Sequence, residues 1–213
     1  MKLPIAGIEV LINEEALLIS SQRPLTTMSS AMLSGGLARV NHIINLHVNK
    51  DYNHPDPAED LVLFARQKGI STPFVGLMTA AYTHRAGVAC KVHAGLTASA
   101  FITAGLSNTC SAGITPPIFQ QPGTINMIVL VDANPTSAAL VNAVITTTEV
   151  KCDLLRRHEI RASDGELATG TSTDAVVIAA TGRGESLLYA GPASTLGWVI
   201  ARAVRQAMEV VLV

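Results

Sequence analysis

Charged residues are scarce in this chain. Only 15% of its 213 residues are Asp, Glu, Lys or Arg, and the formal net charge is −1. Nucleic-acid binding that ignores sequence depends on clustered Lys and Arg contacts to phosphates, and no such cluster occurs here. We therefore expect no nucleic-acid partner.

Long uninterrupted apolar runs are also missing, although 48% of the residues are hydrophobic. A helix that crosses a bilayer needs roughly 20 apolar residues. The stretch between Lys91 and Asp132 has no Asp, Glu, Lys or Arg, but it contains prolines, glutamines and an asparagine that lipid would not tolerate. Pro4 and Glu9 interrupt the region where a signal peptide has its apolar core. We expect a cytoplasmic protein with no membrane contact.

Cysteines are few. The three cysteines, Cys90, Cys110 and Cys152, are odd in number and widely spaced, which favours reduced thiols over a disulfide framework or a zinc knuckle.

Several common catalytic motifs are also absent. The chain has no His-Glu-x-x-His, Gly-x-Ser-x-Gly, Gly-x-x-x-x-Gly-Lys-Ser/Thr or complete Gly-x-Gly-x-x-Gly motif. These absences exclude the ordinary zinc-protease, lipase, P-loop and dinucleotide-binding classes, and we expect no bound metal.

The high apolar content predicts a globular chain with a large core. Because no linker or internal repeat divides it, we expect one domain over residues 1–213. Apolar runs bounded by turn residues predict strands at 5–11, 16–20, 42–48, 74–79, 88–93, 98–104, 124–131, 174–180 and 186–190, the last two as a pair around Gly182–Gly184. The strands occur in clusters rather than in strict β-α-β alternation. The expected fold is therefore an α+β sandwich, with a mixed and largely antiparallel sheet packed against helices.

Three helices are expected. The first follows an Asp56 N-cap with Pro57 at its first position and ends at Gly69, the second runs from Asn134-Pro135 to about His158, and the third follows Pro192. Spacings of three and four predict the buried stripe of the second helix as Val141, Val144, Ile145, Thr148, Cys152 and Leu155. The same rule predicts the inner face of the third as Val199, Ile200, Ala203, Val204, Ala207 and Val211.

Four short segments combine small residues with hydroxyls where a strand meets a turn: Thr27–Ala31, Gly76–Ala81, Thr103–Asn108 and Ala168–Ala175. Small residues let the backbone approach a ligand closely, and successive N–H groups and hydroxyls can hold an oxyanion or a phosphate. The last segment adds the carboxylate of Asp174. Ser, Thr and Asp are also ordinary turn formers, so a structural role remains the alternative for each segment.

Glu149 is a further candidate, because it follows three threonines in an apolar helix and lies four residues after Ile145. A partly desolvated carboxylate beside the buried stripe could act as a general acid or base. The alternative is pairing with a helical cation such as Lys151.

In order and spacing, the motifs resemble the adenosylcobinamide amidohydrolase family of the CbiZ type. The resemblance covers nearly the whole chain and rests on Arg23–Ala31 with Gly35-Gly36, Val75–Ala81, Thr103–Asn108, Gly123–Asn126, Thr146–Glu149 with Lys151, Ala168–Asp174, and Tyr189–Pro192 with Leu196-Gly197. The chain departs from the family pattern at Ser111–Ile114, where a charged run is expected. A charged contact to substrate is therefore missing there.

The resemblance implies hydrolysis of the amide that joins the aminopropanol arm of adenosylcobinamide, or of its phosphate, to the corrin ring, giving adenosylcobyric acid. The corrinoid is then the substrate, and no cofactor is implied. A homo-oligomer is compatible with the sequence. Two other functions stay open: a corrinoid-binding module without catalysis, and a hydrolase of an unrelated small amide.

The same resemblance suggests residue roles. Amide hydrolysis needs an attacking oxygen, an oxyanion stabiliser and a proton for the departing amine. Glu149 or Asp174 would activate water, or a hydroxyl such as Ser30 or Thr171 would attack directly, and the sequence leaves both routes open. We expect one cleft to gather these residues with the substrate-binding candidates Ser29, Thr79, Ser107, Asn108, Thr169 and Thr173.

Overall fold

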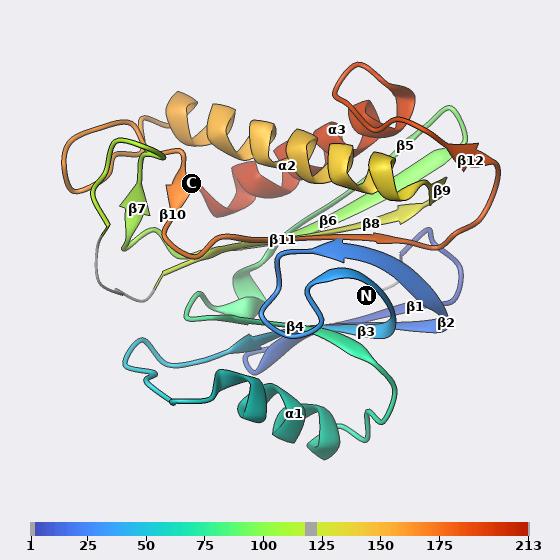
Figure 1. Cartoon of the computed structure of the whole chain (residues 1–213), viewed down its shortest axis with the longest axis horizontal. Coiled ribbons are helices and arrows are strands. Elements are labelled where there is room, and N and C mark those ends of the chain that lie inside the picture. Colours follow the sequence, from blue (N-terminus) through green and yellow to red (C-terminus); the bar gives the residue numbers. More distant parts are fainter. Residues whose placement is uncertain (1–2, 118–122, 213) are drawn as a thin grey trace.

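A computed structural model of the chain describes residues 3–117 and 123–212. Two layers of strands lie between helices (Figure 1). Helices α2 (Ser137–Arg157) and α3 (Thr195–Val211) cover one side, and α1 (Pro57–Gln67) covers the opposite side. This architecture confirms the expected α+β class. Among the described residues, no helix has the length and apolar content that a membrane crossing requires.

The main sheet has eight strands in the order β4-β3-β2-β11-β8-β6-β5, with β1 paired to β2. Five of its seven neighbouring pairs are antiparallel, and the two parallel pairs are β3 with β4 and β8 with β11. The strands are β1 (Ile8–Ile12), β2 (Ala16–Ser29), β3 (Gly36–His47), β4 (Phe74–Thr79), β5 (Gly87–His93), β6 (Leu96–Ala104), β8 (Ile125–Asp132) and β11 (Ala175–Ala180).

Four two-residue strands form two small sheets: β7 (Thr109–Cys110) pairs with β10 (Gly170–Thr171), and β9 (Asn134–Pro135) pairs with β12 (Ser186–Leu187). The expected pairing of 186–190 with 174–180 is therefore wrong. The intervening Gly182 and Gly184 both have positive φ and turn the chain away from β11 toward the start of α2. One short 3-10 helix, η1 (Thr83–Arg85), follows β4.

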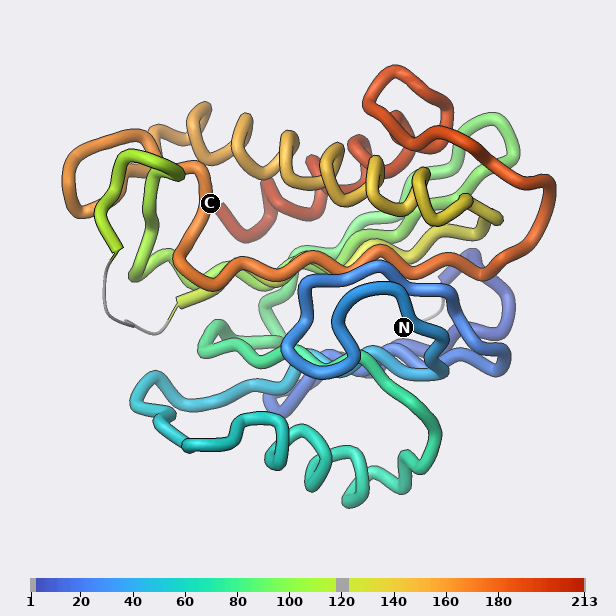
Figure 2. The backbone as a smooth tube through the Cα atoms, in the orientation of Figure 1, coloured from blue at the N-terminus to red at the C-terminus, as the bar shows by residue number. Residues whose placement is uncertain are grey.

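Strand β2 belongs to both layers. Its register against β3 shifts between Ser20 and Leu25, and beyond the shift the segment Thr26–Ser29 pairs with β11 as well. Pro24 lies in the shifted region, where a missing N–H costs no ladder hydrogen bond. Figure 2 shows the chain of β2 passing beside β11, although the two are distant in sequence. The predicted strand at 16–20 was thus too short, because β2 continues to Ser29.

Three apolar cores hold the layers together, and strand β8 shows how they are built. Its Met127, Val129 and Val131 belong to the core under α2 and α3, whereas Ile128 and Leu130 belong to the core between the two strand layers. The two-residue period of a strand places alternate side chains on opposite faces, and both faces of β8 are buried. A third core packs α1 against β3 through Leu61, Phe64 and Ile44, among others.

Helix α2 buries a face that overlaps the predicted one only in part: Leu155 is buried as predicted and Val144 packs against the core, but the rest of the predicted stripe was placed wrongly. Val141 and Ile145 are 45% and 49% exposed. The buried face consists of Ala139, Leu140, Ala143, Thr146, Thr147, Val150, Lys151, Leu154 and Leu155. Small side chains allow close packing, and the Thr146 hydroxyl donates to the carbonyl oxygen of Ala190 at 2.8 Å, so its burial leaves no unpaired polar group.

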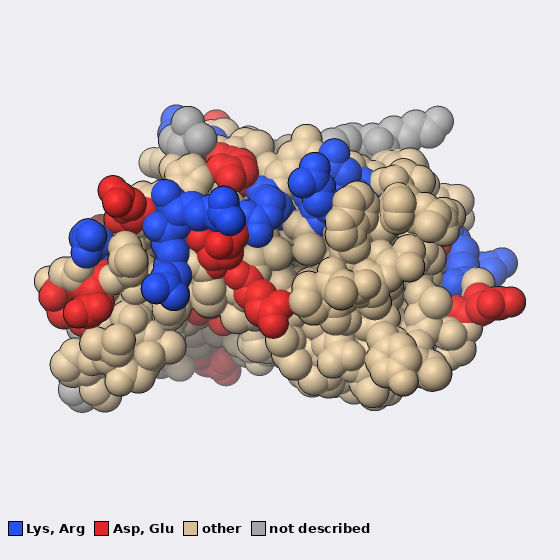
Figure 3. Space-filling model, turned by 90° about the horizontal axis from the view of Figure 1, so that it is seen from above, with Lys and Arg blue, Asp and Glu red and all other residues tan. Residues whose placement is uncertain are grey.

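Helix α3 agrees with prediction, since five of its six predicted inner residues are buried, all except the partly exposed Val211. Figure 3 shows the outer side of α2 and α3, where charged residues gather toward one end. Asp153 binds Arg157 and Arg205 there, at 2.9 and 2.7 Å.

Candidate functional site

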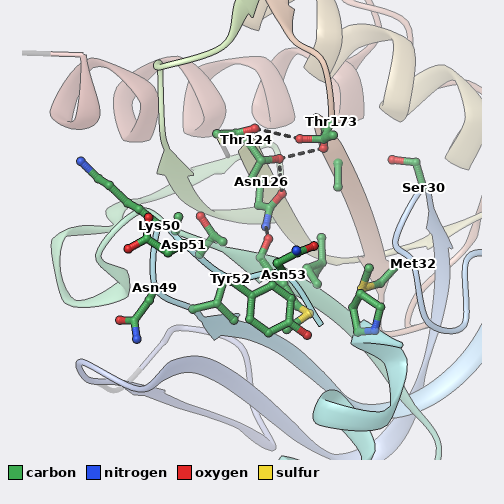
Figure 4. A pocket seen from close by; sticks show the side chains of 18 residues that line it. Ser30, Met32, Asn49, Lys50, Asp51, Tyr52, Asn53, Thr124, Asn126 and Thr173 are labelled. Carbon is green, nitrogen blue, oxygen red and sulfur yellow. Dashed lines mark hydrogen bonds between the residues drawn. The ribbon is translucent and has the colours of Figure 1, made fainter. Parts of the chain in front are cut away.

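A pocket of about 640 Å³ opens between the two strand layers (Figure 4). Its size falls within the range of small-molecule sites, roughly 300–1,000 Å³. Residues from the ends of β2, β3 and β4 and from the starts of β8 and β11 form its wall: Ser30, Met32, Val48, Asn49, Lys50, Asp51, Tyr52, Asn53, Pro57, Leu77, Met78, Thr79, Ala80, Gly123, Thr124, Asn126, Thr173 and Ala175. We call this site the interlayer pocket.

A buried chain of polar side chains joins the layers behind this pocket. The Asn126 amide nitrogen on β8 donates to Asn45 Oδ1 on β3 at 2.8 Å and to the Met78 carbonyl oxygen at 2.9 Å, and Asn45 donates to Thr103 Oγ1 at 3.0 Å. Asn45 and Asn126 are only 1% and 2% exposed. Since both amide protons of Asn126 are already used, its side chain fixes the pocket wall and has no N–H left for a ligand.

Two hydroxyls in the pocket, unlike the Asn126 amide, keep a proton for a ligand. Ser30 Oγ accepts a hydrogen bond from the Val176 N–H at 3.0 Å, and Thr79 Oγ1 accepts one from the Ala81 N–H at 3.1 Å. Within the described parts of the chain, no acceptor takes the proton of either hydroxyl. Each can therefore donate to a ligand. An N–H that points at a hydroxyl oxygen also stabilises negative charge that develops on it.

The loop after β3 supplies the charged groups of the pocket. Of the described residues that line it, Lys50 is the one cation and Asp51 the one carboxylate, and neither forms an ion pair with a described residue. Nearby, the Tyr52 hydroxyl donates to Asp60 Oδ2 at 2.5 Å. Burial, followed by this hydrogen bond, raises the pKa of Tyr52 well above its usual value, so the phenol stays protonated.

Sequence reasoning missed this loop. Its signal was a polar run, Asn49–Asn53, directly after an apolar strand. The parallel pairing of β3 with β4 places that loop at the carboxyl end of a strand, where open sheets bind ligands. Without the pairing, the run is typical of a solvated turn.

Asp174 lies behind the pocket wall, in a cluster with Lys151 of α2. Lys151 Nζ and Asp174 Oδ2 are 2.5 Å apart, and the two side chains are only 9% and 12% exposed. The carboxylate also accepts from the N–H groups of Ile125 and Thr171, each at 3.1 Å, and from the Thr171 hydroxyl.

A Cβ atom at Gly170 would overlap both charged groups, so glycine is required beside them. All these donors tie the turn before β11 to α2 and to the start of β8. The arrangement favours a positioning role for Asp174 over proton transfer.

The structure brings part of the predicted site together. Ser30, Thr79 and Thr173 line the interlayer pocket, and Thr171 and Asp174 stand behind it. The other binding candidates lie outside the pocket wall. Asn108 donates to the Gly123 carbonyl oxygen at 2.8 Å, and Thr169 Oγ1 accepts from the Ala112 N–H. Ser107 lines an adjoining cavity, and the Ser29 hydroxyl is buried with no hydrogen-bond partner among the described residues.

Glu149 is placed elsewhere. It is exposed on α2 and lines a surface groove with Cys152, Asp153 and Arg156. The sequence favoured Glu149 because it lies close to the predicted buried stripe of this helix. In the structure that stripe is exposed to solvent at Ile145. Glu149 does not line the interlayer pocket. Across the described ranges, no group of three or more His, Cys, Asp or Glu residues could hold a metal ion.

Comparisons with known proteins agree with the motif order. Residues 2–212 match the family described as adenosylcobinamide amidohydrolase, CbiZ. A protein of Methanosarcina mazei named adenosylcobinamide amidohydrolase is 35% identical over 184 residues, which cover 82% of this chain and 84% of that protein. One of the same name from Halobacterium salinarum is 33% identical over 118 residues, or 50% of this chain and 46% of that protein.

Two solved structures share the fold. The PH0078 protein from Pyrococcus horikoshii OT3 superimposes with a TM-score of 0.52 at 14% identity, covering 96% of this chain and 82% of that one. A Burkholderia sp. beta-aminopeptidase gives a TM-score of 0.50 at 13% identity, covering 94% and 79%. At such identities the likeness concerns the arrangement of strands and helices alone.

Proposed function

Because the chain belongs to the adenosylcobinamide amidohydrolase family, we propose that it hydrolyses the amide between the aminopropanol arm of adenosylcobinamide, or of its phosphate, and the corrin ring. The products are adenosylcobyric acid and the free amino alcohol, or the amino-alcohol phosphate when the arm is phosphorylated. The interlayer pocket is the observation that supports this reaction, because it places the uncommitted hydroxyls of Ser30 and Thr79 in one recess.

The lining of the pocket suits a corrinoid edge. Asparagine and threonine side chains outnumber charged ones there, and the amide groups around a corrin ring are neutral hydrogen-bonding partners. A pocket of about 640 Å³ takes the arm and the part of the ring that carries it. The rest of the macrocycle lies at the mouth, beside the loop 48–53.

We assign the attack to Ser30. Its Oγ adds to the amide carbonyl carbon. The Val176 N–H, which donates to this Oγ, stabilises the negative charge that develops on Oγ as the hydroxyl gives up its proton. The C–N bond then breaks, the hydroxyl proton ends on the departing amine, and an ester links the corrinoid to Ser30. Water cleaves the ester, which restores the hydroxyl and releases the carboxylate. In the alternative route, Asp51 takes a proton from water, which attacks the amide directly.

The test combines product analysis with two variants. Wild-type protein incubated with adenosylcobinamide should yield a new carboxylate-bearing corrinoid on chromatography. Ser30→Ala should lower kcat by at least about 1,000-fold, because it removes the covalent route, and corrinoid affinity should change less than about threefold. Ser186→Ala, on exposed β12, is the matched control.

The other outcomes are equally informative. Full turnover in Ser30→Ala with a collapse in Asp51→Asn would replace the covalent route by the water route. Corrinoid that the wild type binds but leaves unchanged would indicate a binding module. No interaction at all would leave a hydrolase of another small amide.

A further inference from the structure

His47 is the last residue of β3 and lies beside the interlayer pocket. Residues two apart on a strand share a face, so its side chain is on the same side as Asn45, whose amide bonds across to Asn126 of the other layer. In the parallel register of β3 and β4, His47 stands opposite Thr79, which lines the pocket. The partly buried imidazole ring therefore faces the gap between the layers, at the end of the strand.

An open groove of about 570 Å³ borders His47. The rest of its described wall is the loop Val48–Tyr52, and this same segment lines the interlayer pocket. The two spaces therefore meet along the loop, where the proposed reaction places the macrocycle of the corrinoid. We call this space the His47 groove.

Contacts fix both the orientation and the tautomer of His47. Its Nδ1 lies 3.1 Å from the Ala81 carbonyl oxygen, and a carbonyl oxygen only accepts, so Nδ1 carries the proton. The Tyr82 ring packs against the imidazole with the ring centres 5.4 Å apart. In the neutral ring the lone pair is then on Nε2, and no described residue forms a hydrogen bond or an ion pair with that nitrogen.

This arrangement is typical of a histidine that binds a metal. A backbone carbonyl bonded to one ring N–H holds the imidazole in place and raises the basicity of the other nitrogen. Imidazole is also a good ligand for transition metals. A free ion would need several protein ligands, which the described residues do not group together, but a metal already held by a macrocycle needs only one.

From this geometry we propose that His47 Nε2 binds the cobalt of the corrinoid substrate as an axial ligand. This inference rests on the proposed function. The arm of adenosylcobinamide ends in a hydroxyl and carries no nucleotide base, so water occupies the axial position opposite the adenosyl group. The cobalt–nitrogen bond forms as the cobalt–water bond breaks, and the oxidation state of the cobalt is unchanged. The bond anchors the ring beside the loop Val48–Tyr52 and leaves the arm to enter the interlayer pocket.

Electron paramagnetic resonance of cob(II)inamide bound to the protein tests this bond directly. The unpaired electron of this cobalt lies along the axial direction, so an axial nitrogen splits each cobalt line, whereas water does not. We expect the splitting in the wild type, with a changed pattern when the protein is made with ¹⁵N-labelled histidine. His47→Gln should remove the splitting. Its amide N–H can still donate to the Ala81 carbonyl oxygen, so the contact with that segment is kept.

Affinity for adenosylcobinamide gives a second readout. His47→Gln should raise the Kd by about 10- to 100-fold, the usual effect of disturbing the coordination of a metal. The kcat at saturating substrate should change by less than about threefold, because the ligand acts on the ring and not on the amide. His93→Gln is the matched control and should change neither value. His93 also packs on an aromatic ring, that of Trp198 at 4.7 Å, but it lines neither the interlayer pocket nor the His47 groove.

The outcomes separate this inference from the proposed function. A wild type that hydrolyses adenosylcobinamide but shows no nitrogen splitting would refute the cobalt bond and leave the proposed function standing. Splitting that persists in His47→Gln would also refute it, since another nitrogen would then be the ligand. If the wild type neither binds nor hydrolyses a corrinoid, the proposed function fails and this inference fails with it.

Discussion

The Lys151–Asp174 pair offers a sharp test of whether Asp174 positions the pocket wall. In Asp174→Asn the amide side chain can still accept from the N–H groups of Ile125 and Thr171, but it no longer neutralises the Lys151 ammonium. Lys151 is largely buried, so its charge has little water to replace the lost partner. Breaking one side of a buried ion pair costs about 3–5 kcal/mol.

The loss should be visible in equilibrium unfolding. Urea unfolding followed by far-UV circular dichroism at pH 7 should show a lower midpoint at an unchanged m-value. For a protein of this size, 3–5 kcal/mol corresponds to a decrease in Tm of about 6–20 °C. Glu185→Gln, on an exposed turn, should change the free energy of unfolding by less than about 0.5 kcal/mol.

A double variant separates the charge from the contacts. Asp174→Asn combined with Lys151→Met removes both charges, and it should be more stable than Asp174→Asn alone because no unpaired ammonium remains. A loss below about 1 kcal/mol in Asp174→Asn, or a double variant no more stable than the single one, would refute the argument. An Asp174→Asn protein that stays fully stable but loses all turnover would return Asp174 to the role of base.

Two further outcomes follow from other contacts. Asn45→Ala leaves the Asn126 amide without one of its buried acceptors and should destabilise the protein by about 1–3 kcal/mol for each group left unpaired; a urea midpoint equal to that of the wild type would contradict this. Hydrogen bonds from Arg205 and then Arg157 lower the pKa of Asp153 below its usual 3.8, so the folded state favours the ionised carboxylate. This stabilisation is present above pH 3.8 and disappears as the pH falls through the lower pKa of the folded state. Asp153→Asn should therefore be less stable than the wild type at pH 7. If the difference in unfolding free energy between the two proteins does not become smaller in acid, the expected direction of the pH dependence is contradicted.

The fold was predictable where apolar residues form an unbroken run or a clear period. Strand β8 follows from a continuous apolar run bounded by turn residues, and the inner face of α3 follows from apolar residues spaced three and four apart. Helix α2 broke the rule because its buried face mixes leucines and a valine with Thr146, Thr147 and Lys151, polar residues that the hydropathy pattern assigns to a surface. The exposed Val141 and Ile145 then drew the prediction to the wrong side.

The site was predictable only in part, for a related reason. Hydroxyls at strand ends identified Ser30, Thr79 and Thr173 correctly as neighbours of one pocket. Their convergence depends on the packing of two layers, which no local pattern encodes. Lys50 and Asp51 were missed because charges in a loop are typical of any solvated turn. The partner of Asp174 is 23 residues earlier in the chain, on a helix face that was itself assigned wrongly.

The double membership of β2 has a consequence for how the chain folds during synthesis. Ser29 pairs with Val177, so the neighbour of this strand emerges only after most of the protein has been made. Until then, β2 presents an unpaired edge, and the apolar side chains meant for the core between the layers have no opposing wall. Contacts so distant in sequence slow folding and tie it to a single cooperative event. A nascent chain that stalls before Ala175 therefore lacks the strand that joins its two layers, and becomes a substrate for chaperones or for aggregation.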